Sequence, residues 1–269
     1  MFLNSQNIHF AYIAEKTVLN GISFSITKGE TLAIVGASGC GKSTLLRILS
    51  GILPNVKGNS LQGDILINGL MPDQYRQTEK LAFMFQEATL MPHLTVKQNI
   101  ELPLKIKGST NEQKTNDLIK AVGLEEYSNY LPKHLSGGMK TRVALARSFS
   151  TNPELLLLDE PFSALDIAWK SKLYVELEKL REKTDTTVVV VTHDVQEALL
   201  LANHVIVMNS FGGIETQKEI KSDYSIMQRV SNISGYMNSV YESHMLSIQD
   251  AIINGQNRKH EKQDTIHIA

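Results

Sequence analysis

The segment Gly36-Ala-Ser-Gly-Cys-Gly-Lys-Ser-Thr44 follows the apolar run TLAIV at residues 31–35, and residues 45–49 after it have helical apolar spacing. This order predicts a strand, a glycine-rich loop and a helix, and the loop matches the pattern G-x-x-x-x-G-K-[ST]. Gly39 and Gly41 permit backbone angles closed to other residues, so N–H groups can curl around phosphate oxygens. Lys42 adds a charge for the β- and γ-phosphates, and the Ser43 hydroxyl can ligate Mg²⁺. A nucleotide phosphate site is therefore expected here.

Two further apolar runs end in polar residues. LLLL at residues 155–158 is followed by Asp159 and Glu160, and TVVVV at residues 187–191 is followed by Thr192 and His193. Continuous apolar strands are typical of a parallel sheet covered on both faces, and such α/β sheets bind ligands at the carboxyl ends of their strands. Beside a phosphate loop, Asp159 is expected to hold Mg²⁺ and Glu160 to polarise an attacking water.

The rest of the chain divides into three kinds of pattern. Alternating apolar residues around 8–12 and 22–26 predict two N-terminal strands. Residues from about 87 to 150 are mostly helical in spacing, which predicts a helical insertion in the α/β core. After about Asn209 the signal weakens: residues 223–254 have scattered helical spacing, and the chain from Gly255 onward is expected to fray.

A second helix start stands within the helical insertion. Leu135-Ser-Gly-Gly-Met139 precedes the helical spacing of residues 140–149. Ser136 is a favourable N-cap, and two glycines leave the helix N-terminus open to an anion. The alternative is a capped helix behind a flexible turn.

Composition limits the classes of protein. The 269 residues are 42% hydrophobic and 20% charged, which excludes a disordered, collagen-like or disulfide-scaffold protein. The net charge of -1 gives no basic field for nucleic acid. The single Cys40 cannot form an intrachain disulfide and is expected to be a small loop side chain rather than a redox sensor. The apolar runs are too short to span a membrane and no signal peptide is evident, so another chain is expected to hold the protein at any membrane.

Six motifs in order resemble the ATP-binding subunit of an ABC transporter. They are the loop at residues 36–44, Gln86 after FMF, LSGG at 135–138, LLLLDEP at 155–161, SALD at 163–166 and His193 after VT. The resemblance implies a P-loop NTPase (RecA-like) core with an antiparallel β-subdomain and the helical subdomain inserted at about 87–150. It implies an ATP-binding domain over residues 1–215 and a C-terminal extension over 216–269, for which a divergent tail is favoured over a regulatory extension.

The resemblance also implies residue roles. Glu160, His193 and Gln86 would be catalytic, with Glu160 as the base, and Ser43, Gln86 and Asp159 would hold Mg²⁺. Tyr12 would stack on adenine, although a strand tyrosine is more often a packing residue. The residues implied to bind ATP are Tyr12, Gly36, Ala37, Ser38, Gly39, Cys40, Gly41, Lys42, Ser43, Thr44, Ser136, Gly137, Gly138 and Asp166. Of these, Ser136, Gly137 and Gly138 would meet the ATP held by the other subunit of a head-to-tail dimer, and Asp166 ends the stretch that resembles the D-loop. Met139 stands where the family more often has Gln, so one amide contact is lost while the helix start remains.

A free-standing subunit with one nucleotide domain resembles bacterial importers, and LSGGMK and FQEATLMPHLTVKQNI resemble the nitrate/sulfonate/taurine branch. The implied partners are a second ATP-binding subunit, membrane permease subunits and, indirectly, a periplasmic or lipid-anchored solute-binding protein, with no nucleic acid. The implied location is peripheral, on the cytoplasmic side of the inner membrane. The apolar residues after Gln86 are expected to dock the permease; the alternative is that they pack inside the helical subdomain. The alternatives in function are an ABC exporter or lipoprotein-release ATPase, and a soluble non-transport ABC ATPase.

Overall fold

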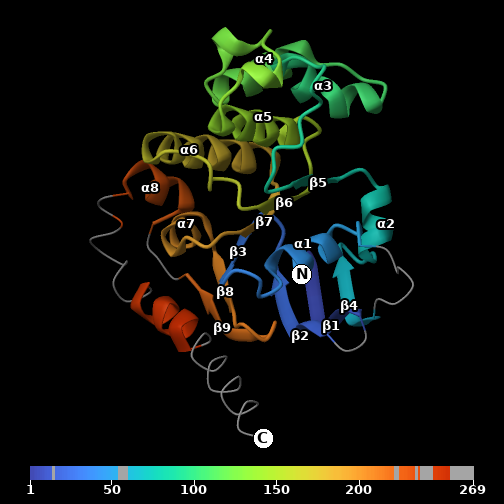
Figure 1. Cartoon of the computed structure of the whole chain (residues 1–269), viewed down its shortest axis with the longest axis vertical. Coiled ribbons are helices and arrows are strands. Elements are labelled where there is room, and N and C mark those ends of the chain that lie inside the picture. Colours follow the sequence, from blue (N-terminus) through green and yellow to red (C-terminus); the bar gives the residue numbers. More distant parts are fainter. Residues whose placement is uncertain (14–15, 54–59, 221–223, 234–235, 237–244, 255–269) are drawn as a thin grey trace, which may run out of the picture.

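Two sheets and a group of helices make up the part of the chain that the computed structural model describes, which is residues 1–13, 16–53, 60–220, 224–233, 236 and 245–254 (Figure 1). The smaller sheet is antiparallel, with the strand order β2-β1-β4. Its strands are β1 (Leu3–Ile13), β2 (Lys16–Ile26) and β4 (Ser60–Ile67). The two N-terminal strands expected from alternation are therefore confirmed.

The larger sheet has six strands in the order β5-β6-β7-β3-β8-β9. All neighbours are parallel except β9, which pairs antiparallel to β8. The strands are β3 (Thr31–Gly36), β5 (Leu81–Met84), β6 (Leu155–Asp159), β7 (Thr187–Val191), β8 (His204–Met208) and β9 (Ile214–Glu219). Every residue of β3, β6 and β7 is buried, as their continuous apolar sequences predict.

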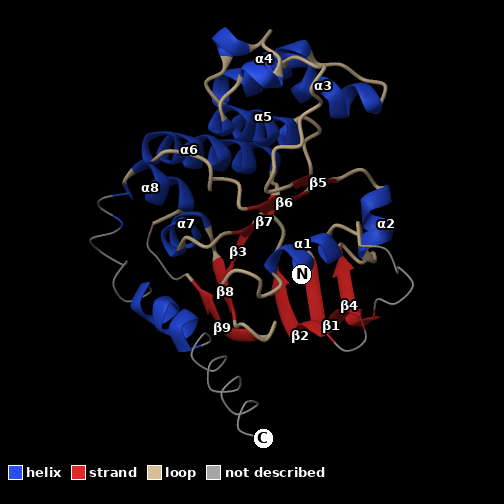
Figure 2. Cartoon of the chain, in the orientation of Figure 1, coloured by secondary structure: helices blue, strands red, loops and turns tan. Residues whose placement is uncertain are grey.

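Helices cover both faces of the larger sheet, and three of them form a separate group at one end of the molecule (Figure 2). That group holds α3 (Val96–Ile106), α4 (Glu112–Ala121) and α5 (Gly137–Phe149), with short 3-10 turns at Glu125–Tyr127 and Pro132–His134. The remaining helices are α1 (Lys42–Leu49), α2 (Pro72–Gln77), α6 (Ile167–Thr184), α7 (Val195–Leu201) and α8 (Ile226–Ser231). Residues 245–254 are also helical. Helices thus occupy most of the stretch predicted as a helical insertion.

Alternate side chains of each central strand enter two different hydrophobic cores, because successive residues of a strand point to opposite faces. In β3, Ala33 and Val35 join the core beneath α5, α6 and α7, whereas Leu32 and Ile34 join the core that contains α1 and the antiparallel sheet. Leu45 and its neighbours in α1 thereby pack between the two sheets. This packing fixes the loop that joins β3 to α1.

The C-terminal segment packs on the α/β core where it is described. Arg229 of α8 is buried and donates to the carbonyls of Leu199 and Ala202, at 3.2 and 2.8 Å, so it caps the C-terminal end of α7. The domain boundary predicted at residue 215 falls inside β9, whose ladder with β8 belongs to the sheet. We therefore propose that the ATP-binding domain continues at least to Glu219. Residues 255–269, for which fraying is expected, lie outside the described residues.

None of the described helices is both long enough and apolar enough to cross a membrane.

Candidate active site

Glycines shape the loop between β3 and α1. Gly41 is the N-cap of α1 and has φ 104°, a conformation that side chains disfavour. A Cβ at Gly41 would lie 2.9 Å from the carbonyl oxygen of Val18, and one at Gly36 would lie 2.5 Å from that of Met208. Both approaches are too close for a side chain. The loop can therefore turn sharply against β2 and β8 and direct the start of α1 toward a phosphate.

Lys42 closes this loop from within. Its ammonium group donates to the carbonyl oxygens of Gly36 and Ala37, at 2.9 Å each. Only 6% of Lys42 is exposed, so water screens its charge weakly within the loop. The lysine predicted to hold phosphates is thus positioned by the loop itself.

Ser43 and Asp159, the two residues expected to hold Mg²⁺, are in contact. The Ser43 hydroxyl donates to Asp159 Oδ1 at 2.9 Å, which joins the first turn of α1 to the end of β6. Burial raises the pKa of the Asp159 carboxyl; the Ser43 hydrogen bond opposes this shift and the neighbouring Glu160 carboxylate adds to it. Hydroxyl and carboxylate oxygens suit Mg²⁺, which usually takes few protein ligands and completes its shell with phosphate and water. Within the described residues, no group of three or more His, Cys, Asp or Glu side chains is placed to hold a metal ion.

Glu160 is held by two polar side chains from different elements. Gln86, which follows β5, donates from Nε2 to Glu160 Oε2 at 3.2 Å, and His193 Nδ1 lies 3.4 Å from the same oxygen. Glu160 itself has φ 47°, an unfavourable backbone conformation for a residue with a side chain. Such outliers concentrate at functional sites, where the surrounding structure holds them. Gln86, Glu160 and His193 therefore converge where the strands end.

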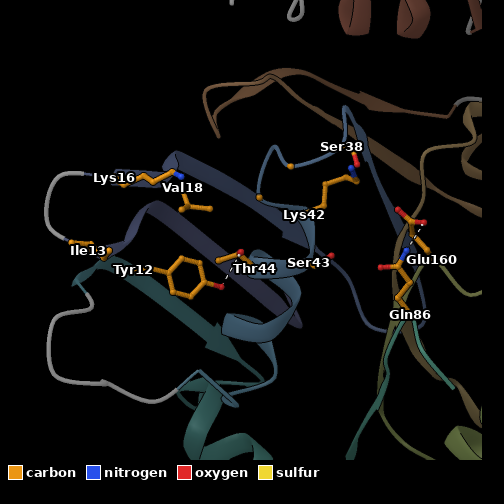
Figure 3. Close-up of a pocket in the computed structure, with 12 residues that line it drawn as sticks. Tyr12, Ile13, Lys16, Val18, Ser38, Lys42, Ser43, Thr44, Gln86 and Glu160 are labelled. Atoms are coloured by element: carbon orange, nitrogen blue, oxygen red, sulfur yellow. Dashed lines mark hydrogen bonds between the residues drawn. The ribbon is translucent and has the colours of Figure 1, made fainter. Parts of the chain in front are cut away.

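A cavity of about 640 Å³ opens over the loop (Figure 3). The Tyr12 ring lies at one side of it, and the Tyr12 hydroxyl is 3.1 Å from Thr44 Oγ1. Glu160 and Gln86 lie on the opposite side, beyond Lys42. The lining residues are Tyr12, Ile13, Lys16, Val18, Ser38, Gly39, Gly41, Lys42, Ser43, Thr44, Gln86 and Glu160. Sequence reasoning missed Ile13, Lys16 and Val18, whose only signal is their place in the hairpin that the phosphate loop packs against.

Cys40 faces away from the cavity. Its side chain is 3% exposed and joins the core that contains α1. Burial raises the pKa of the Cys40 thiol, although the nearby Lys42 charge opposes the shift. A buried thiol with a raised pKa is poorly reactive. The structure thus supports the interpretation of Cys40 as a small loop side chain.

The other predicted ATP ligands do not line this cavity. Ser136 caps α5 by accepting the N–H of Met139 at 3.2 Å, and Asp166 caps α6 by accepting the N–H of Trp169 at 3.0 Å. These two helix starts adjoin, because a Cβ on Gly138 would lie 3.2 Å from the carbonyl oxygen of Ala164. The structure thus brings the 136–138 and 163–166 motifs together, and neither motif lines the cavity over the phosphate loop of the same chain.

Comparison with known proteins identifies the family. The family described as ABC transporter matches residues 19–163. The chain belongs to the ABC transporter family. An aliphatic sulfonates import ATP-binding protein, SsuB, of Bacillus anthracis is 39% identical over 77% of this chain and 80% of its own length. The spermidine/putrescine import ATP-binding protein PotA of Thermotoga maritima is 43% identical over 71% of this chain and 52% of its own length.

A solved structure agrees with this assignment. The dimeric structure of a post-hydrolysis state of the ATP-binding cassette MJ0796, bound to ADP and Pi, matches with a TM-score of 0.71 and 32% identity. The match covers 82% of this chain and 99% of that one. The predicted P-loop α/β fold is therefore confirmed, and this ABC chain is an ATP-hydrolysing cassette.

Proposed function

We propose that two copies of this ABC ATPase form the motor of an importer, in which ATP hydrolysis drives permease subunits in the cytoplasmic membrane. The observation that carries the proposal is the convergence of Gln86, Glu160 and His193 beside the pair Ser43 and Asp159. A phosphate-binding loop alone serves many protein classes, whereas a held carboxylate at this place serves hydrolysis.

Each group at the site has a distinct task in hydrolysis. The loop N–H groups and Lys42 bind the phosphates, and Ser43 and Asp159 hold Mg²⁺, which offsets phosphate charge when bound. Glu160 accepts a proton from the attacking water, because its carboxylate lines the cavity over the loop, whereas Asp159 is bonded to Ser43. Gln86 and His193 hold the Glu160 carboxylate in place. Tyr12 offers a ring face for adenine at the other side of the cavity.

A second copy completes each site. Ser136, Gly137, Gly138 and Asp166 do not line the cavity of their own chain, and the start of α5, with its two glycines, favours an anion supplied from elsewhere. Ile167, beside Asp166, is 83% exposed, and an exposed large apolar side chain next to a proposed ligand suits an interface. We therefore assign these motifs to the ATP of the partner copy.

The segment that follows Gln86 is the proposed docking surface for the permease. Asn99, fully buried, accepts from the N–H of Met91 at 2.8 Å and donates to the carbonyls of Met91 and Leu94. Arg147 donates to the carbonyl of Thr89 at 3.0 Å. The backbone is thus fixed, while the Met91 side chain is 40% exposed. Leu90 packs against the core instead, so Met91 and its exposed neighbour Pro92 carry the contact.

Cross-linking tests this docking surface. With Cys40 replaced by serine, Met91→Cys is expected to form a disulfide or bismaleimide link with a cysteine in a cytoplasmic loop of the assembled permease. Leu246→Cys is the matched control, because Leu246 is 62% exposed in the helical segment 245–254, far from this loop in Figure 1. No cross-link from Met91→Cys, in a complex shown to be assembled, would assign Met91 to packing within the helical subdomain.

We propose that the imported solutes are of the nitrate, sulfonate and taurine type, on the basis of the motif variants and of relatives such as SsuB. Vesicles that contain this subunit, its genomically adjacent permease and its binding protein are expected to accumulate an aliphatic sulfonate only with internal ATP. Lys42→Ala should abolish uptake, because phosphate binding is lost. Spermidine uptake without sulfonate uptake would contradict the solute class, and ATP-dependent efflux would contradict import.

A further inference from the structure

The first turn of α6 contacts two functional elements at once. Asp166, at the end of the SALD motif, caps this turn through the N–H of Trp169. The side chains of Trp169 and Lys170, which follow in the same turn, contact different neighbours. Trp169 reaches Arg142 of α5, and Lys170 reaches Glu197 of α7. α5 begins at the signature residues, and α7 follows the turn that carries His193.

The contact with α5 is a close cation–π stack. The guanidinium carbon of Arg142 lies 3.7 Å from the centroid of the Trp169 ring, and Arg142 is 7% exposed. Arg142 also donates to the carbonyl of Val122 at 2.9 Å, beyond the end of α4. A Cβ on Gly123 would lie 2.6 Å from the Trp169 ring. Since desolvated cation–π contacts are stronger than exposed ones, this stack ties α5 to α6.

The contact with α7 is a buried ion pair. Lys170 Nζ donates to Glu197 Oε1 at 2.6 Å and lies 3.7 Å from Asp194 Oδ2. The Glu197 side chain is 4% exposed and also accepts from Thr192 Oγ1 at 2.6 Å and the Tyr174 hydroxyl at 3.1 Å. Burial lowers the pKa of Lys170, but the hydrogen bond and charge of Glu197 outweigh it, so the pKa of Lys170 is raised.

His193 lies between two residues that this network holds. Thr192 donates to Glu197, and the N–H of Asp194 donates to Thr192 Oγ1 at 3.0 Å. Lys170 faces both Asp194 and Glu197. The backbone on each side of His193 is therefore fixed to the first turn of α6, whereas the His193 side chain itself is 65% exposed and meets Glu160.

We propose that Trp169 and Lys170 are positioning residues that join the signature helix to His193, so that binding of the partner's ATP at Ser136 sets the geometry of hydrolysis at Glu160. The inference rests on the proposed ATPase with sites shared between two chains, and it adds a connection within one chain between the signature helix α5 and the His193 turn. Neither residue lines the ATP cavity, so both act through Arg142 and the His193 turn. A misplacement of a catalytic group by about 1 Å costs on the order of 100-fold in rate.

The test compares turnover with ATP affinity in the purified full-length chain. Lys170→Met is expected to lower kcat on the order of 10- to 100-fold without a change in KM for ATP, and Lys170→Arg should restore most of the loss. Lys179→Met is the matched control, because Lys179 lies on the same helix in an exposed pair with Glu176 at 2.7 Å and should behave as wild type. Trp169 is the chain's single tryptophan, so an unchanged emission spectrum in Lys170→Met shows that the α5 contact is intact.

Trp169→Leu, alone and combined with Lys170→Met, tests the connection. If the two contacts act in series, the double variant loses no more kcat than the worse single variant, because coupled residues are non-additive. Lys170→Met leaves the Glu197 charge buried and without its lysine partner, which can destabilise the fold by itself. Lys170→Met/Glu197→Gln removes that charge as well and provides a second variant free of this effect. A wild-type kcat in Trp169→Leu or in Lys170→Met would overturn the proposal. So would additive losses of kcat in the Trp169→Leu/Lys170→Met double variant, or losses of kcat that track thermal stability alone. Inactivity of the wild-type chain would instead contradict the proposed ATPase.

Discussion

Replacing Glu160 by glutamine is expected to preserve ATP binding and to slow hydrolysis about 100- to 10,000-fold, the contribution of a positioned general base. The amide has nearly the size of the carboxylate and keeps an oxygen for the hydrogen bond from Gln86 Nε2. It cannot accept a proton from water. The left-handed backbone at Glu160 imposes the same cost on both side chains, so the fold should be unchanged.

Two measurements on purified protein check this expectation. Steady-state ATPase gives the loss of turnover, and size-exclusion chromatography with ATP should reveal an accumulated dimer, because bound ATP is no longer consumed. Glu126→Gln is the matched control, since Glu126 is an exposed carboxylate in the 3-10 turn Glu125–Tyr127. Turnover near wild type in Glu160→Gln would remove Glu160 from the role of base.

The central strands of this fold are predictable because each is a short apolar run buried on both faces. Helices α5, α6 and α7 cover one face, and α1 with the antiparallel sheet covers the other. β3, β6 and β7 are buried at every position. The edge strands β4 and β9 lack such a pattern: most of their residues remain at least partly exposed, so nothing in their sequence separates them from loops. These strands form because they pair with β1 and β8, and a local sequence pattern carries no information about that pairing.

The site divides in the same way. The loop at residues 36–44 and the carboxylates after β6 follow from residue types and spacing. Glu160 and His193 each follow an apolar strand, so the sequence places both at the carboxyl edge of the sheet, whereas Gln86 is expected beside them only from the family resemblance. Lys170 and Glu197 have the sequence pattern of solvated helix charges, yet tertiary packing buries their contact. No local signal identifies such a pair.

Mixing two inactive variants should restore activity, and this expectation decides whether one active site spans two chains. Lys42→Ala spoils the phosphate loop. Gly137→Arg blocks the signature helix start, and it spares the Ser136 cap because a Cβ at Gly137 meets open space. Each variant alone should be inactive, since every site in its homodimer contains one defect.

In a mixed dimer with two-fold symmetry, one site receives both defects and the other receives neither. Random exchange makes about half of the dimers mixed, so about a quarter of all sites are whole and ATPase should return to at most about that fraction. Wild type mixed with the doubly substituted chain is the control, because its mixed dimers have no whole site. Wild-type chains should then lose about half of their activity if sites are shared, and none if each chain holds a complete site. Recovery in the first mixture is the result that requires a shared site, because no chain in that mixture holds both elements intact. Full retention of wild-type activity, with mixed dimers shown to form, would establish that the phosphate loop and the signature motif of one chain serve the same ATP.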